Sequence, residues 1–129
     1  MSKILIVDDD PVMRKLLAKA VAPLNMNVYF ASDGIHALDA VRCNKDFDLL
    51  ITDISMPVLD GRQLITTIKS DPSLADIPVL IMSGVVGMSE IADLLDLGAF
   101  KFIPKPFNMQ TLREDVQSAL ECHQICNHN

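Results

Sequence analysis

Short apolar runs alternate along the chain with longer segments whose apolar residues recur at helical spacing. The strand candidates are residues 3–7, 28–31, 49–53, 79–83 and 100–103. The run at 49–53 is apolar on both faces, as expected for a central strand of a parallel sheet. Helical segments fill the intervals, so the pattern predicts five βα units in one domain, with the sheet covered on both faces.

Local signals mark where several of the helices begin and end. Asp10 and Pro11 supply a side-chain cap and a preformed first residue for the first helix. Ser89 is a candidate cap for the fourth helix, which is expected to run through Leu97 and to end at Gly98 in a left-handed conformation. Further helices are predicted after Asp33-Gly34, after Asp60-Gly61 and from Asn108.

Composition narrows the class of protein. The chain has 129 residues, of which 50% are hydrophobic and 22% charged, and this favours a single globular domain with no room for an output domain. A net charge of -6 argues against direct nucleic-acid binding. With no membrane span and no signal peptide recognisable, we expect a cytoplasmic protein without membrane insertion. The cysteines are expected to be free thiols: Cys43, Cys122 and Cys126.

Polar residues that suit a chemical site follow four of the predicted strands. In a parallel α/β sheet the carboxyl ends of the strands share one edge, and ligands bind there. Residues far apart in the sequence are therefore expected to meet in one pocket. They are the acidic cluster at 8–10, Asp53, Ser83 and Lys105.

The carboxylates of this pocket favour a divalent cation. Clustered carboxylates repel one another, and a bound cation is one common resolution. Mg²⁺ takes one or two protein carboxylates and keeps several waters. We therefore expect Mg²⁺ between Asp9 and Asp53, with Asp8 acting through a water and Asp10 serving only as the helix cap.

Asp53 is also a candidate covalent nucleophile. A carboxylate can attack phosphorus to form an acyl phosphate, and it needs no general base because it is already ionised. Lys105 would hold one oxygen of the transferring group and the Ser83 hydroxyl another.

Six short motifs surround these residues: Val-Asp-Asp-Asp at 7–10, Thr-Asp-Ile-Ser-Met-Pro at 52–57, Leu-Asp-Gly at 59–61, Ser-Gly at 83–84, Gly-Ala at 98–99 and Pro-Lys-Pro-Phe at 104–107. In their order and spacing the chain resembles the receiver domain of two-component response regulators, over about residues 3–121. The resemblance implies a flavodoxin-like order of the parallel strands and a receiver domain at 1–123 followed by a tail at 124–129.

The resemblance implies that Asp53 accepts a phosphoryl group from a sensor histidine kinase or a histidine phosphotransfer protein. Ser83 and Lys105 take the positions that contact this group, and the peptide bond after Lys105 is expected to be cis. The chain would thus be a phosphoryl-accepting regulator and not an enzyme in the ordinary sense. The expected Mg²⁺ ligands are the side chains of Asp8, Asp9 and Asp53 and the main-chain carbonyl of Ser55.

Phe102 matches the switch aromatic of the family. On that resemblance, phosphorylation changes the surface of helix 4, strand 5 and helix 5, which then controls a protein partner or a homodimer. The apolar helix from Ser89 is expected to contribute an exposed apolar patch to such contacts. Val85, two residues after Ser83, cannot orient an attacking water, so a long-lived phosphorylated state is predicted.

Two other readings compete with this one, and the tail carries a separate candidate metal site. A phosphatase of the haloacid dehalogenase type would use Asp8 as its nucleophile, but it would leave Asp53 without a role and needs a further acidic pair after the lysine. A pseudo-receiver would act only as an interaction module, which the complete set of acids, hydroxyl and lysine disfavours. The cysteines and histidines at 122–128 have tempting spacing for a metal, although a frayed terminal helix is the favoured interpretation.

Overall fold

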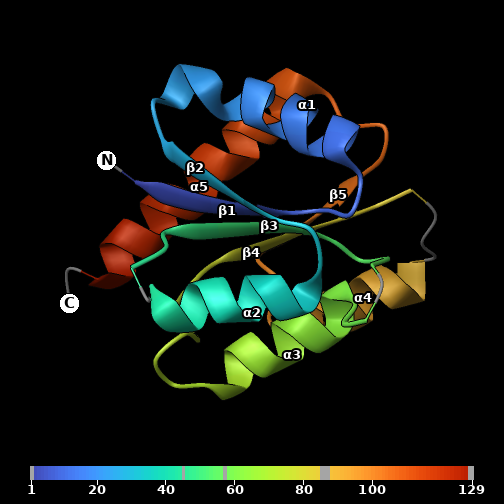
Figure 1. Cartoon of the computed structure of the whole chain (residues 1–129), viewed down its shortest axis with the longest axis vertical. Coiled ribbons are helices and arrows are strands. Elements are labelled where there is room, and N and C mark those ends of the chain that lie inside the picture. Colours follow the sequence, from blue (N-terminus) through green and yellow to red (C-terminus); the bar gives the residue numbers. More distant parts are fainter. Residues whose placement is uncertain (1, 45, 57, 85–87, 128–129) are drawn as a thin grey trace.

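Five parallel strands form one sheet in the order β2-β1-β3-β4-β5 (Figure 1). The computed structural model describes residues 2–44, 46–56, 58–84 and 88–127, with the backbone alone at 88 and 124–127. This strand order is the flavodoxin-like one that the resemblance implied. The strands are β1 (Lys3–Val7), β2 (Asn27–Ala31), β3 (Leu49–Asp53), β4 (Val79–Ser83) and β5 (Lys101–Pro104).

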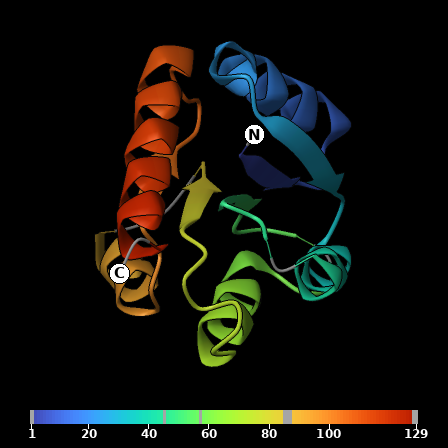
Figure 2. The same ribbon diagram turned by 90° about the vertical axis from the view of Figure 1, so that its left-hand side faces the viewer.

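Helices cover both faces of the sheet, with α1 and α5 on one side and α2, α3 and α4 on the other (Figures 1 and 2). A short 3₁₀ turn, η1 (Ala22–Leu24), follows the first helix. The predicted doubly wound architecture in a single domain is confirmed. The helices are α1 (Pro11–Val21), α2 (Gly34–Cys43), α3 (Gly61–Ser70), α4 (Met88–Asp96) and α5 (Met109–Asn127).

Successive residues of each central strand enter different cores, because strand side chains alternate between the two faces. Leu5 and Leu50 pack with α2 and α3, whereas Ile4 and Ile51 pack with α1 and α5. All of these side chains are fully buried. The unbroken apolar runs in the sequence follow from this double coverage, and they hold the strand ends of the site in place.

Most of the predicted helix ends are confirmed. The Asp10 carboxylate accepts a hydrogen bond of 2.9 Å from the Val12 amide and so caps α1. Gly98 has a φ of 114°, the left-handed conformation predicted for it. Ser89 does not cap α4, because this helix begins at Met88 and places Ser89 inside its first turn.

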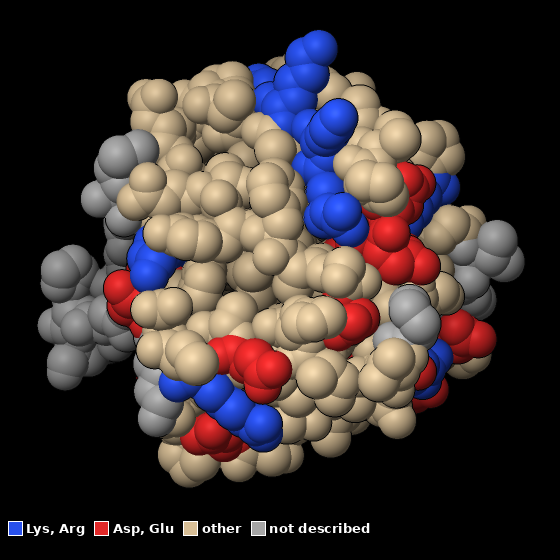
Figure 3. Space-filling view, viewed as in Figure 1, with Lys and Arg blue, Asp and Glu red and all other residues tan. Residues whose placement is uncertain are grey.

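Charge is unevenly distributed over the face shown in Figure 3. A stripe of basic side chains runs down from α1, and acidic side chains gather beside it, toward the carboxyl ends of the strands. In the part of the chain that the structure describes, no helix has an apolar stretch long enough to cross a membrane. Cys43 and Cys122 are free thiols, as predicted, and the Cys126 side chain lies outside the described set.

Candidate functional site

The predicted site residues meet at the carboxyl edge of the sheet. Carboxylate oxygens of Asp8, Asp9 and Asp53 lie within 4.8 Å of one another. Beside them opens a cavity of about 640 Å³, which Asp9 and Ser83 help to line. This volume lies in the range of small-molecule sites, about 300–1,000 Å³. The convergence predicted from strand ends is therefore present in the structure.

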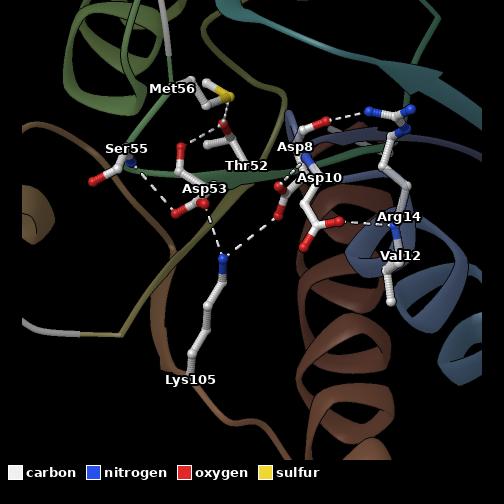
Figure 4. Close-up of polar contacts among 9 residues, drawn as sticks. All are labelled: Asp8, Asp10, Val12, Arg14, Thr52, Asp53, Ser55, Met56 and Lys105. Atoms are coloured by element: carbon white, nitrogen blue, oxygen red, sulfur yellow. Dashed lines mark hydrogen bonds and ion pairs between the residues drawn. The ribbon is translucent and has the colours of Figure 1, made fainter.

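Asp8 is the buried member of the acidic cluster, with 1% of its surface exposed. Its Oδ1 accepts a hydrogen bond of 2.9 Å from the Asp10 amide, which fixes the turn from β1 into α1. The Arg14 guanidinium, on α1, donates a hydrogen bond to the Asp8 main-chain carbonyl and so fixes the same connection between β1 and α1 (Figure 4). Burial raises the pKa of Asp8, although the Asp10 amide and the Lys105 charge oppose this shift.

Lys105 joins two carboxylates of the cluster. Its Nζ donates to Asp53 Oδ2 at 2.9 Å and lies 3.5 Å from Asp8 Oδ2 (Figure 4). Burial lowers the pKa of Lys105, but the hydrogen bond to Asp53 and the charges of Asp53 and Asp8 outweigh burial, so the net shift is upward. The ammonium is thus held in its charged form beside Asp53. The peptide bond between Lys105 and Pro106 is cis, as expected.

The two oxygens of Asp53 are held differently. Oδ2 accepts a hydrogen bond from Lys105, whereas the one hydrogen bond that Oδ1 accepts from the described residues is a long contact of 3.4 Å from the Ser55 amide. The preceding Thr52 is fully buried, and its hydroxyl donates to the Asp53 main-chain carbonyl at 3.0 Å. The backbone is therefore firmly anchored, while Oδ1 is the less restrained carboxylate oxygen.

The start of α3 is packed directly against the backbone that carries Asp53. The Gly61 amide donates to the Ile54 carbonyl at 2.9 Å. A Cβ at position 61 would lie 2.6 Å from the Asp53 carbonyl oxygen and 2.8 Å from the Ile54 Cα. Only glycine allows this approach, so the Asp-Gly motif at 60–61 sets the distance between α3 and the Asp53 backbone.

The cluster fits a divalent cation. Three carboxylates against the one ammonium of Lys105 leave two uncompensated negative charges. Asp8 Oδ2 is buried, and beyond its 3.5 Å ion pair with Lys105 it has no hydrogen-bond partner among the described residues. Mg²⁺ prefers oxygen ligands, and a carboxylate oxygen that lacks a hydrogen bond and lies among other carboxylates is suited to bind it.

Asp8→Asn is expected to stabilise the metal-free protein at neutral pH, by about 1–3 kcal/mol in free energy of unfolding, because it removes a buried charge. Folding raises the pKa of Asp8 above its ordinary value of 3.8. The folded state therefore binds this proton more tightly, and the wild type loses stability as pH rises from about 4 through the raised pKa. The advantage of the variant should grow over the same interval.

Urea unfolding in EDTA from pH 4 to 8 measures this effect. Asp10→Asn is the matched control, since asparagine also caps helices and Asp10 is exposed. Added Mg²⁺ should stabilise the wild type and stabilise Asp8→Asn much less. An Asp8→Asn advantage that shrinks as pH rises would contradict this assignment.

The residues of the expected output surface lie on the α4, β5 and α5 side. Phe102 is half-buried and packs against the core shared with α2 and α3. Leu95 and Phe100 are 45% and 37% exposed, which provides apolar surface on this side. Val85, on which the predicted lifetime depends, lies outside the described residues, and the side chain of Met88 is not described.

The predicted tail begins inside a helix, since α5 continues through Asn127. His123 is buried. Its Nδ1 lies 3.1 Å from the Asp76 carbonyl, and its Nε2 lies 3.6 Å from an Asp48 oxygen. The side chains at 124–129, which the possible metal site would need, lie outside the described set.

Two charged residues of the cavity lie outside every motif singled out in the sequence. Arg62 in the first turn of α3 and Glu90 in the first turn of α4 both line it. Their side chains approach to 3.4 Å between Nη2 and Oε2. Nothing in the local pattern distinguishes them from ordinary surface charges. The nearby Asp-Gly turn at 60–61 is the one signal that would have drawn attention to position 62.

Comparison with known proteins agrees with this geometry. A family model described as the response regulator receiver domain matches residues 4–117. A chemotaxis protein CheY homolog of Campylobacter jejuni is 31% identical over 119 residues, 92% of each chain. Chemotaxis protein CheY1 of Helicobacter pylori is 32% identical over 92% of this chain and 96% of its own. The crystal structure of CheY4 of Vibrio cholerae superposes with a TM-score of 0.85, at 28% identity over 93% of this chain and 99% of that one.

Proposed function

Because this chain belongs to the receiver-domain family of response regulators, we propose that it is a phosphoacceptor switch in which Asp53 is the residue phosphorylated. The observation that carries the proposal is the contact of 2.9 Å between Lys105 Nζ and Asp53 Oδ2, within an acidic cluster at the carboxyl edge of the sheet. We place the domain that performs this function at 1–123 and the tail at 124–129, with α5 continuing from the one into the other through Asn127.

The chemistry needs few groups. Asp53 Oδ1 attacks the phosphorus of a phosphohistidine, the new O–P bond forms as the P–N bond breaks, and the imidazole departs with the electron pair of that bond. Lys105 binds one phosphoryl oxygen, because its ammonium already lies beside the nucleophile. Ser83, 6% exposed and lining the same cavity, donates its hydroxyl to another.

Mg²⁺ supplies charge neutralisation when it is bound. The residues that would hold it are the side chains of Asp8, Asp9 and Asp53 and the main-chain carbonyl of Ser55. Because Asp8 Oδ2 has no hydrogen-bond partner among the described residues, we propose that Asp8 binds the metal directly and not through a water, as was expected from the sequence.

Phosphorylation of Asp53 changes the surface formed by α4, β5 and α5. The Lys105 amide donates to the Ser83 carbonyl at 2.9 Å, so the two phosphoryl-binding residues are joined through the backbone where β4 and β5 end. Ile81 pairs with Phe102 in the same ladder, so a shift of β4 reaches the aromatic directly. A downstream protein, or a second copy of the chain, reads the resulting surface. The phosphoryl group itself comes from a histidine kinase or a phosphotransfer protein.

Incubation with acetyl phosphate and Mg²⁺ tests the proposal. The intact mass is expected to rise by one phosphoryl group per chain, and EDTA should prevent the rise. The pseudo-receiver reading predicts no gain with any donor. The phosphatase reading predicts steady release of inorganic phosphate from an unrelated monoester and no dependence on Asp53.

A further inference from the structure

The cavity beside Asp53 is lined by a basic side chain that the proposed chemistry does not use. Of the described residues that line it, Arg62 is the one basic side chain, and it shares the space with the carboxylates of Asp9, Asp60 and Glu90. The opening is therefore strongly acidic apart from this guanidinium. A phosphodonor is an anion and is repelled both by these carboxylates and by the ones that would hold the metal.

The position of Arg62 is tied to that of the nucleophile. It directly follows Gly61, whose amide is bonded to Ile54 and whose Cα lies against the Asp53 backbone. The capping box formed by Asp60 and Gln63 rigidifies the same turn, with bonds of 2.9 and 3.0 Å. The backbone at position 62 is therefore held in a fixed place relative to Asp53.

The partner of Arg62 in the structure is easily exchanged. Arg62 and Glu90 are 38% and 51% exposed and 3.4 Å apart, and ion pairs so open to solvent contribute little. An arginine forms shorter, often bidentate bonds with a phosphoryl group. Lys105, by contrast, is already engaged by Asp53 and Asp8, so Arg62 is the more available cation for an arriving donor.

We propose that Arg62 is a donor-binding residue, whose guanidinium leaves Glu90 to contact the phosphoryl group of an incoming phosphodonor in the cavity, and that Glu90 competes with the donor for it. The proposal rests on the proposed function, since it concerns how the group destined for Asp53 is captured. It adds a link between α3 and α4, because donor binding releases Glu90 from its contact with α3.

The rate of mass gain from acetyl phosphate in Mg²⁺, below saturating donor, tests this inference. Arg62→Gln is expected to slow labelling by about three- to ten-fold, mainly through a higher half-saturating donor concentration. Glu90→Gln is expected to accelerate it by about two-fold or more. In the double variant the acceleration should disappear, because the residue for which Glu90 competes is gone.

Two matched variants control for net charge. Arg42→Gln on α2 and Glu121→Gln on α5 change exposed residues on other helices, and both should label at the wild-type rate. Arg62→Gln labelling at the wild-type rate would overturn the inference. So would an acceleration by Glu90→Gln that persists without Arg62, since that would reflect bulk charge. Failure of the wild type itself to gain mass would instead overturn the proposed function.

Discussion

Asp53→Asn is expected to abolish covalent phosphorylation, reducing the mass gain from acetyl phosphate in Mg²⁺ below detection. In the proposed reaction a carboxylate oxygen of Asp53 attacks phosphorus, which the amide cannot do, and no other described carboxylate has the environment of Asp53. Asp8 is buried, and its Oδ1 is bonded to the Asp10 amide. Asp9 is exposed and lies at the edge of the cavity. The loss should therefore be complete and not partial.

A matched variant separates the loss of the nucleophile from the loss of one acidic charge. Asp10→Asn lies in the same acidic cluster and preserves the cap of α1, so it should label at close to the wild-type rate. Circular dichroism of both variants checks that the fold is intact. Continued labelling of Asp53→Asn, together with its loss in Asp8→Asn, would favour the phosphatase-type reading with Asp8 as nucleophile.

Gly61→Ala is expected to destabilise the protein by roughly 3 kcal/mol, at the upper end of typical overpacking costs. The new methyl group would meet the Asp53 carbonyl oxygen at 2.6 Å and the Ile54 Cα at 2.8 Å, and both are main-chain atoms. Relief requires α3 to move away from β3, which displaces Asp53. Urea unfolding should show the loss of stability, and labelling of the surviving folded fraction should be slower than in the wild type.

Gly84→Ala is the matched control for this experiment. It makes the same chemical change at the end of β4, where the nearest atom to the new methyl group is the Lys105 Cβ at an ordinary 3.9 Å. Both substitutions restrict the unfolded chain equally, so the difference between them measures the clash at position 61. Stabilities for the two variants that agree within about 0.5 kcal/mol would contradict the close approach.

Much of the fold is legible in local patterns. Strands that are buried on both faces appear in the sequence as unbroken apolar runs. Helix starts are marked by caps such as Asp10 and Asp33, whose carboxylates each accept a hydrogen bond from a main-chain amide. These signals act over a few residues, so they survive without knowledge of the rest of the chain. The predicted start of α4 is wrong for the same reason, because the sequence alone does not distinguish a serine that caps a helix from a serine inside its first turn.

The strand order was expected from family resemblance and not from periodicity, and the structure confirms it. Periodicity reports which faces a strand buries, but it carries no information about which strand lies beside it. The convergence of Asp8, Asp53 and Lys105 could be predicted because the carboxyl ends of parallel strands share one edge in any order of pairing.

The sequence by itself determined the five βα units, helix caps such as Asp10 and Asp33, and the identity of the residues at the four strand ends. Only the tertiary structure decided that Asp8 is buried with an orphaned oxygen, that Lys105 lies closer to Asp53 than to Asp8, and that Arg62 meets Glu90 across the cavity. The physical reason is range. Backbone preferences and apolar spacing act between near neighbours in the chain, whereas burial, pKa shifts and ion pairs depend on distances that exist only after the sheet has assembled.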